Sequence, residues 1–255
     1  DRPGAYSVLY EAADASGKGA RDVAVQPIAS ELGLRYVKWV CDNRRKVAEM
    51  SGGRIGYFHM PNTAVEGIQE FAKGWYPQLK RDALIIDERN NAGGFIPDVY
   101  TTIMAQKPLN MWARRPGQQS WLTPGTAFAG PLAMLVNGYA GSGGDALPWY
   151  FKAQKLGTVI GTRTWGGLVG IDRDIETIDG GGITMPAFGF YTLDGQWAVE
   201  NRGTEPDIEI DNLPDEEHRG LDRQLEKAVE VLMRDLQTKA PRLPEQPPYP
   251  RDKAR

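Results

Sequence analysis

The sequence has a single cysteine and only two histidines among its 255 residues. One cysteine excludes an internal disulfide framework, and two distant histidines are too few for a zinc site. We therefore expect neither a metal ion nor any other cofactor. A chain without disulfides is compatible with either redox environment. We expect the cytoplasm, with the periplasm as the alternative.

Long hydrophobic runs and an excess of positive charge are also missing. The longest apolar runs, such as residues 132–136, are far shorter than the ~20 residues that span a bilayer. We therefore expect a soluble chain with no membrane partner. Lysine and arginine together number 30, against 33 acidic residues. Because nucleic-acid binding needs a basic stripe, we expect no nucleic-acid partner.

The sequence has no initial methionine, and no charged segment followed by an apolar one marks a secretion signal near Asp1. Its length suffices for one substantial core and a fragment of a second. Because the sequence starts with neither methionine nor a secretion signal, we expect this chain to be a piece of a longer protein.

The first segments present are two strand-like stretches, residues 6–12 and 21–28, joined by a turn-rich segment at 14–20. A lone hairpin is marginally stable, so we expect it to belong to a domain that begins upstream. From Ser30 apolar residues recur at helical spacing up to the glycines at 52 and 53. This pattern predicts a linking helix of about five turns with Ser30 as its N-cap.

The middle of the sequence alternates between apolar runs and helical patterns. Four apolar runs read as buried strands, at residues 55–60, 83–87, 132–137 and 157–161. Three helix-like patterns lie between them, at residues 63–73, 96–106 and 144–154. This repetition predicts an α/β fold with a largely parallel sheet.

The last part of the sequence has a different character. Residues 180–207 are rich in glycine and threonine, which predicts a β-hairpin against the sheet. Residues 221–236 return to helical spacing, and the tail from 240 onward is rich in proline, arginine and lysine. We expect that tail to be flexible or to lie on a neighbouring molecule.

The strongest candidate for chemistry is Ser142, in the segment NGYAGSGGDALPWYF between a predicted strand and a predicted helix. Free backbone N–H groups and the dipole at a helix N-terminus can hold a developing negative charge there. The neighbouring glycines let a substrate approach the backbone. The alternative is that Ser142 merely caps the helix, as serines at such positions commonly do.

A second glycine-rich turn, DERNNAGGF, follows the predicted strand at 83–87 in the same way. Its Gly93 and Gly94 offer a second N–H donor to an oxyanion, and acyl transfer commonly uses two. The alternative is a loop in which glycine is needed only for its positive φ. Two such turns after two strands of one sheet favour the catalytic interpretation.

Four ordered motifs carry a family resemblance: DERNNAGGF, NGYAGSGGD, IGTRTWGGLVG and WAVENRGTEPD. Together they resemble the catalytic domain of tricorn-type serine peptidases, a branch of peptidase family S41 that is related to C-terminal processing proteases. The resemblance covers about residues 30–236. It implies a ClpP/crotonase-like fold of repeated β-β-α units. The implied domains are the last strands of a PDZ-like domain (1–29), a linking helix (30–53), an S41-type catalytic domain (54–239) and a flexible Pro-rich tail (240–255).

The resemblance also implies roles for individual residues. Ser142 matches the nucleophile that forms an acyl-enzyme, and the backbone N–H groups of Gly94 and Gly143 match the oxyanion-hole donors. Glu200 matches the acid that supports a histidine base. Tricorn-type enzymes carry an aspartate at the position of Gly143. Because only the backbone is used there, we expect little loss.

In tricorn-type enzymes the histidine lies ahead of the PDZ-like domain, in sequence that this chain does not include. The resemblance further implies peptide substrates, upstream PDZ-like and propeller domains, and a symmetric homo-oligomer, a hexamer in tricorn. A neighbouring branch uses a Ser–Lys dyad instead. Here Gly167 occupies the place of that lysine, which favours the histidine-dependent branch.

Three other interpretations remain open. His59 or His218 could act as the base, and the order Ser142, Glu200, His218 is that of α/β-hydrolases. However, AGSGG lacks the first glycine of their G-x-S-x-G elbow. A peptide-binding scaffold without catalysis is a second possibility. A crotonase-like acyl-CoA enzyme is a third, and it would not need Ser142.

The resemblance places the specificity position near Ala113, beside Trp112, where tricorn has an acid that favours basic side chains. No acid stands at this position, so we expect an apolar or relaxed preference, since a basic side chain would be desolvated without a partner. Tyr139, Trp165 and Trp197 are further candidates for lining the groove. The alternative for these aromatic residues is ordinary packing.

Overall fold

The computed structural model describes residues 7–11, 16, 18, 19, 21–115, 118, 120–241 and 243–249. The chain divides into two compact units, Asp1–Asp42 and Asn43–Arg255. None of the helices in the described residues is long and apolar enough to cross a bilayer.

The first unit contains the predicted hairpin. Strands β1 (Ser7–Glu11) and β2 (Arg21–Val25) pair antiparallel. The predicted turn at 14–20 lies largely outside the described residues. Helix α1 (Leu32–Ser51) follows, and the Ser30 hydroxyl accepts the N–H of Leu32 at 3.2 Å, close to the predicted cap. The boundary between the two units falls within α1.

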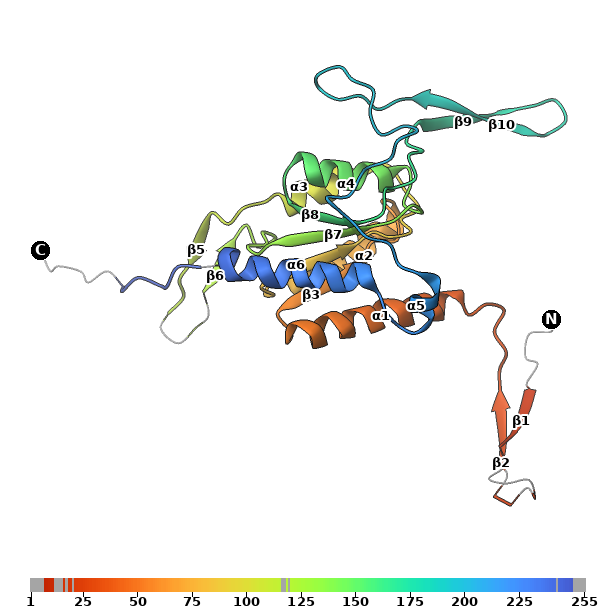
Figure 1. The fold of residues 1–255 in the computed structure, drawn as a ribbon, viewed down its shortest axis with the longest axis horizontal. Helices are drawn as coiled ribbons and strands as arrows, with labels where there is room; N and C mark the ends of the chain where they lie inside the picture. The colour runs from red at the N-terminus through yellow and green to blue at the C-terminus, as the bar shows by residue number, and fades with distance from the viewer. Residues whose placement is uncertain are drawn as a thin grey trace, which may run out of the picture. The chain divides into compact units, whose positions relative to one another are not determined.

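The second unit is built on a five-stranded sheet in the order β11–β8–β7–β4–β3. Figure 1 labels three of these strands, β3, β7 and β8. Its strands are β3 (Ile55–His59), β4 (Ala83–Asp87), β7 (Leu132–Val136), β8 (Gly157–Gly161) and β11 (Ile208–Glu209). Every neighbouring pair is parallel. The α/β class with a parallel sheet is therefore confirmed.

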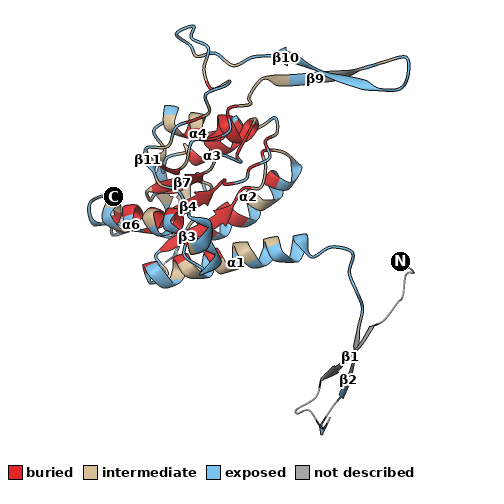
Figure 2. Ribbon diagram, turned by 45° about the vertical axis from the view of Figure 1, so that its right-hand side comes forward, coloured by how far each residue is buried: buried red, intermediate tan, exposed pale blue. Residues whose placement is uncertain are grey.

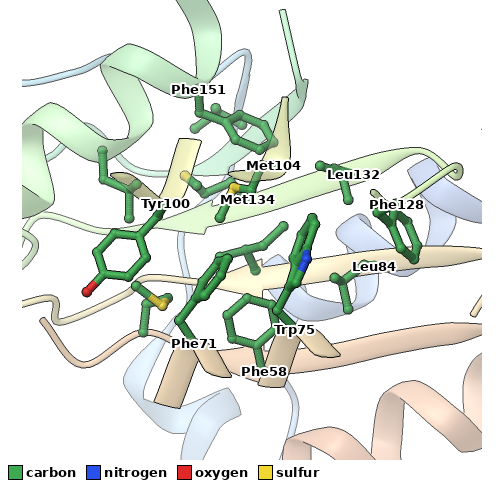
Figure 3. Packing of buried hydrophobic residues seen from close by; sticks show 14 of the residues in the cluster. Phe58, Phe71, Trp75, Leu84, Tyr100, Met104, Phe128, Leu132, Met134 and Phe151 are labelled. Carbon is green, nitrogen blue, oxygen red and sulfur yellow. The ribbon is translucent and has the colours of Figure 1, made fainter. Parts of the chain in front are cut away.

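Three helices connect successive strands: α2 (Val65–Gln78), α3 (Pro97–Met104) and α4 (Gly143–Ala153). Because β3, β4, β7 and β8 lie side by side in sequence order, right-handed crossovers place all three helices on one face. Sheet residues such as Phe58 and Met134 pack there against Trp75 of α2, Tyr100 of α3 and Phe151 of α4 (Figure 3). This buried cluster fixes the two helix N-termini that follow β4 and β7.

The opposite face is covered by α6 (Arg223–Lys239), which packs on β4, β7 and β8. Leu225 and Leu232 of α6 are fully buried. The second half of α1 contributes Asn43, whose side chain donates to the Tyr57 hydroxyl at 3.2 Å. With helices on both faces, the central strands are buried, as the red colour of β3, β4 and β7 in Figure 2 shows. Strands covered on both faces read as continuous apolar runs, which explains why the sequence predicted them.

The remaining elements lie outside this sheet. Strands β5 (Asn110–Trp112) and β6 (Trp121–Thr123) form one hairpin, and α5 (Pro214–His218) is a short helix. Strands β9 (Gly170–Glu176) and β10 (Gly182–Phe188) form another. Of the predicted tail at 240–255, the structure describes only 240, 241 and 243–249.

The β9–β10 hairpin differs from the prediction of a hairpin at 180–207. It begins at Gly170, and within the described residues its strands pair with each other and not with the five-stranded sheet. The turn lies at 177–181, closed by the N–H of Thr177 donating to the Gly181 carbonyl at 2.8 Å, with Gly180 at φ 79°. The glycine-rich stretch is thus the turn and second strand of a hairpin that starts earlier.

Candidate active site

Ser142 occupies the N-cap of α4, just past the carboxyl end of β7. Its backbone has φ 56° and ψ −117°, and a non-glycine residue with positive φ is uncommon and strained. Two neighbouring segments hold this conformation. The Gly141 N–H donates to the Asn91 carbonyl at 3.0 Å, and the Ser142 N–H donates to the Gly167 carbonyl at 3.1 Å. The serine therefore sits on a turn that its surroundings impose.

The two glycine-rich turns meet at one edge of the sheet. Strands β4 and β7 are parallel neighbours, so their carboxyl ends lie together. Gly93 has φ 82°, and a Cβ added to it would lie 2.7 Å from the Ser142 Cβ. Only glycine allows this approach.

The N–H groups of Gly94 and Gly143 lie close to each other. A Cβ built on Gly143 would be 2.8 Å from the Gly94 nitrogen. Within the described residues, neither N–H donates to a protein acceptor. Both residues line the same pocket as Ser142. Two unpaired donors at a helix N-terminus can stabilise a negatively charged oxygen formed beside the serine.

Gly143 has no room for a side chain. A Cβ there would overlap the Thr63 hydroxyl and the Gly94 carbonyl. The Thr63 hydroxyl is itself buried, with no hydrogen-bond partner in the described part of the chain. The aspartate that the resemblance implies at this position therefore does not fit this backbone, because Thr63 and Gly94 occupy the space that its side chain would need.

Asp145 is a residue that the motif analysis missed. Its buried carboxylate accepts the Ser142 N–H at 2.8 Å, the Gly166 N–H at 2.7 Å and the Thr164 hydroxyl at 2.5 Å. Burial raises the pKa of Asp145, and these hydrogen bonds act against that rise. The Ser-x-x-Asp spacing at a helix start, a capping-box pattern, was the signal that could have found it.

Glu200 lies across the same pocket on a strained segment. Its Oε2 accepts the N–H groups of Leu168 and Val169, both at 2.6 Å. Val199 and Asn201 on either side have φ 71° and 59°, and positive φ at a β-branched residue is an outlier. Such strain persists only where the surrounding structure fixes it, and here it fixes the direction of Glu200.

One loop, residues 164–169, links Ser142 to Glu200. The Trp165 N–H donates to the Ala140 carbonyl at 2.9 Å, beside the turn that holds Ser142. The Asn201 N–H donates to the Gly166 carbonyl at 2.7 Å, beside Glu200. Because both turns bond to the same loop, their spacing is fixed.

The pocket has a volume of about 640 Å³, in the ordinary range for ligand sites. Ser142, Gly94, Gly143, Glu200 and Trp165 line it, so the structure brings these predicted residues together. The β9–β10 hairpin and the segment after it supply further apolar walls, among them Ile171, Pro186, Phe188 and Phe190. Sequence reasoning had not assigned this hairpin to the site.

Four aromatic and specificity candidates lie elsewhere. Trp112 stacks on Trp121 of β6 with ring centroids 6.0 Å apart, and Ala113 follows it, outside the pocket lining. Tyr139 is 81% exposed and does not line the pocket. Trp197 packs edge to face on Tyr191.

Neither histidine lines the pocket. His59 is buried in β3, with Nε2 2.8 Å from the Arg89 carbonyl, and burial lowers its pKa. His218 is exposed and is the last residue of α5. Within the described residues, no three His, Cys, Asp or Glu side chains are placed to hold a metal ion.

A buried ion-pair network lies beneath the DERNN turn. The Arg89 guanidinium donates to both Asp87 oxygens, at 2.9 and 2.6 Å, and to both Asp222 oxygens at 3.0 Å. Burial acts to raise the pKa of Asp87, but the Arg89 charge and hydrogen bonds hold that pKa below its ordinary value. Asp222 also caps α6 by accepting the Leu225 N–H at 3.0 Å. Arg89 thereby ties the glycine-rich turn after β4 to the N-terminus of α6.

Glu88, between Asp87 and Arg89, is buried in a different setting. Neither of its side-chain oxygens has a hydrogen-bond partner in the described part of the chain. Burial, and then the charges of Asp145 and Asp87, raise the pKa of Glu88 well above its ordinary value. Burial therefore stabilises the neutral form of Glu88 relative to its charged form.

Known proteins resemble this chain in sequence and in fold. Residues 54–210 match the model of peptidase family S41. The chain is 37% identical over 250 residues to "Tricorn protease" of Thermoplasma acidophilum, covering 95% of this chain and 23% of that protein. It is 35% identical to "Tricorn protease homolog 1" of Streptomyces coelicolor, over 87% of this chain and 21% of that protein.

Among solved structures, the crystal structure of the tricorn protease matches with a TM-score of 0.81 at 37% identity. The match covers 87% of this chain and 22% of that one. The chain therefore spans about a fifth to a quarter of the length of these relatives.

Proposed function

Because the chain belongs to peptidase family S41, we propose that it is the serine-bearing catalytic part of a tricorn-like serine peptidase that cleaves peptides. Ser142 is the nucleophile, the Gly94 and Gly143 N–H groups hold the oxyanion, and Glu200 supports a histidine base. The observation that carries this proposal is Ser142 on its strained turn, beside two unpaired N–H donors in one pocket.

The reaction follows the logic of acyl transfer. The Ser142 oxygen attacks the peptide carbonyl while the base removes the hydroxyl proton, and the carbonyl electrons move to the oxygen held by Gly94 and Gly143. The tetrahedral intermediate collapses, the C–N bond breaks, and the base returns its proton to the departing amine. Water then attacks the acyl-enzyme by the same route, which frees the acid product and Ser142.

The histidine base comes from outside this sequence. His59 and His218 do not line the pocket, whereas Glu200 does, and its Oε1 accepts no hydrogen bond from the described residues. That oxygen is available to a histidine brought in by another segment. A serine needs such a base to become a nucleophile near neutral pH.

We further propose that this chain is part of a longer protein. The named relatives extend far beyond the matched region, which supports the presence of further domains. As the resemblance implies, we propose that these are upstream PDZ-like and propeller domains and that the protein forms a homo-oligomer, with the hexamer of tricorn as the first candidate. Residues 1–29 then form the end of the PDZ-like domain, and the sheet units belong to the repeated β-β-α fold. The cytoplasm is the proposed compartment.

The cleavage preference next to Ser142 is apolar or relaxed. Among the pocket-lining residues, Ala146 lies one helical turn after Ser142, and Trp165 and Leu168 belong to the loop at 164–169; none of the three carries a charge. Cleavage of short peptides ending in leucine and in arginine tests this preference. A strong preference for arginine would overturn it.

Covalent labelling tests the proposed nucleophile. A fluorophosphonate is applied to this chain, to a longer chain that includes the upstream region, and to the Ser142→Ala variant of each. Labelling of only the longer chain, at Ser142, supports a base supplied from upstream. Labelling of this chain alone would place the base within it and make His218 and His59 the next substitutions. No labelling of either chain would reject the peptidase.

The same experiment separates the other candidate functions. A scaffold that only binds peptides gives no label at Ser142. A crotonase-like acyl-CoA enzyme shares the paired oxyanion donors but does not need this serine. An α/β-hydrolase triad requires His218 in the pocket, and the exposed position of that residue at the end of α5 argues against it.

A further inference from the structure

The pocket around Ser142 has an unbalanced charge. Its described lining residues include two carboxylates, Asp98 and Glu200, and no lysine or arginine. Glu200 already accepts two backbone N–H groups through Oε2. Asp98 is exposed, and within the described residues its carboxylate has no ion-pair or hydrogen-bond partner. Asp98 is therefore the carboxylate that remains available to a ligand.

Asp98 lies at a definite place along the pocket. Ser142, Ala146 and Tyr150 follow each other at four-residue spacing on α4, and all three line the pocket. Eight residues of α-helix rise about 12 Å. Asp98 is the charged group that acts on the Tyr150 hydroxyl, where burial first and then Asp98 raise the pKa. Asp98 and Tyr150 line the same pocket, and a hydrogen bond from Gln154 to Thr101 joins their helices just beyond them, so the carboxylate lies near the far end of this row.

Helices α3 and α4, which carry Asp98 and Tyr150, lie against each other. The Gln154 side chain donates to the Thr101 hydroxyl at 3.0 Å. Thr101 and Gln154 lie three and four residues beyond Asp98 and Tyr150, so the two helices remain in contact over that length. An extended peptide rises about 3.3 Å per residue. The distance of about 12 Å therefore corresponds to three or four peptide residues.

We propose that Asp98 forms a cation-binding subsite, which selects peptides with a positive charge three or four residues from the bond at Ser142. This inference rests on the proposed peptidase function, because it takes the bound ligand to be a peptide. The cation is a lysine or arginine side chain or the α-ammonium group of the peptide. Apolar residues such as Phe188 and Phe190 line the same pocket as Asp98.

A matched control variant tests whether Asp98 acts only by stabilising the start of its helix. Asp98 is the acidic residue in the first turn of α3, where it also stabilises the helix dipole. Glu66 stands in the first turn of α2 but outside the pocket lining. Glu66→Gln therefore removes a comparable helix-end charge without changing the pocket.

The experiment measures peptide binding to the Ser142→Ala variant of the full-length protein, so that hydrolysis does not interfere. Labelled peptides of one sequence carry lysine or uncharged norleucine at each of four positions on either side of the scissile bond. Each is made with a free and with an acetylated N-terminus, and fluorescence anisotropy gives the dissociation constants. Lysine at the third or fourth position should bind about three- to tenfold more tightly than norleucine at low ionic strength.

Asp98→Asn should abolish this preference, while Asp98→Glu and Glu66→Gln should keep it. The preference should also weaken as salt is added, because the pair is partly exposed. If tight binding is lost on acetylation of the N-terminus but not on replacing lysine by norleucine, the α-ammonium group is the cation. Equal binding of lysine and norleucine peptides with either terminus, or a preference that survives in Asp98→Asn, would overturn the subsite.

Fluorophosphonate labelling of the protein with Ser142 intact keeps the two proposals apart. Labelling without any charge preference rejects only the subsite. A charge preference that depends on Asp98, without labelling, supports the subsite and rejects the peptidase.

Discussion

The backbone N–H of Ser142 donates to the carboxylate of Asp145 over 2.8 Å, three residues further along the same helix turn. The same carboxylate accepts the Gly166 N–H and the Thr164 hydroxyl. It therefore joins the nucleophile turn to the loop that also holds Glu200. Asp145 positions the site without lining the pocket.

Asp145→Asn should distort the nucleophile turn. One amide oxygen cannot replace two carboxylate oxygens, and the amide NH₂ would face an N–H or O–H donor. We expect the rate of Ser142 labelling to fall about tenfold or more and unfolding in urea to become easier by about 1–3 kcal/mol. Asp215→Asn, at an exposed pair with Arg219, is the control. Unchanged labelling would contradict this prediction, because it would show that the turn at Ser142 does not need both oxygens of an ionised Asp145.

Gly93→Ala should inactivate the site more than it destabilises the fold. The new Cβ would lie 2.7 Å from the Ser142 Cβ on a backbone with φ 82°, so the two turns must separate. We expect labelling and peptide cleavage to drop about 100-fold or more, as when an oxyanion donor is lost. Gly125→Ala, where nothing lies within 4 Å of the new Cβ, should leave both rates unchanged. Full activity in Gly93→Ala would show that the contact of the two turns is not needed.

Glu200→Gln separates charge from geometry. The amide oxygen can still accept the Leu168 and Val169 N–H groups, so the loop should keep its shape. Without the negative charge the histidine base is no longer supported, and we expect kcat to fall about 10²–10⁴-fold with little change in KM. Glu200→Ala should also raise KM, because the loop loses its acceptor. A Gln variant with native kcat would remove Glu200 from the catalytic set.

Arg89→Met should destabilise the fold, because it leaves Asp87 and Asp222 buried without their counter-charge. We expect a loss of about 3–5 kcal/mol near neutral pH, measured by urea unfolding. The folded pKa of Asp87 is lowered, so its contribution is present above the ordinary aspartate pKa and is lost as pH falls through the folded value. The gap between native and variant should therefore shrink in acid. A gap that is independent of pH would contradict this assignment.

Glu88→Gln should change how stability depends on pH. Because the folded pKa of Glu88 is raised, its stabilising effect is complete below the unfolded pKa of about 4.3 and is lost as pH rises through the folded value. Relative to the native protein, the Gln variant should therefore gain stability as pH increases. Urea unfolding at several pH values measures this difference. Glu66→Gln, at an exposed carboxylate, should show no gain of this sign.

The sequence by itself determined the sheet and the two turns at its edge. Apolar runs and helical spacing are local patterns, and they located β3, β4, β7 and β8 to within one residue at either end. The glycines around Ser142 and after Asp87 predicted tight turns, because positive φ and close backbone approach favour glycine. Parallel neighbouring strands then bring those turns to one edge of the sheet.

The sequence motifs did not reveal how distant segments come together. Arg89 and Asp222 are separated by 133 positions and Asp145 and Thr164 by 19, yet each pair is buried and bonded. Trp112, Ala113 and Tyr139 fall outside the pocket lining, while the β9–β10 hairpin and Asp98 enter it. Only the tertiary structure decided these contacts, because loop paths and helix packing, not local periodicity, set which side chains share a cavity.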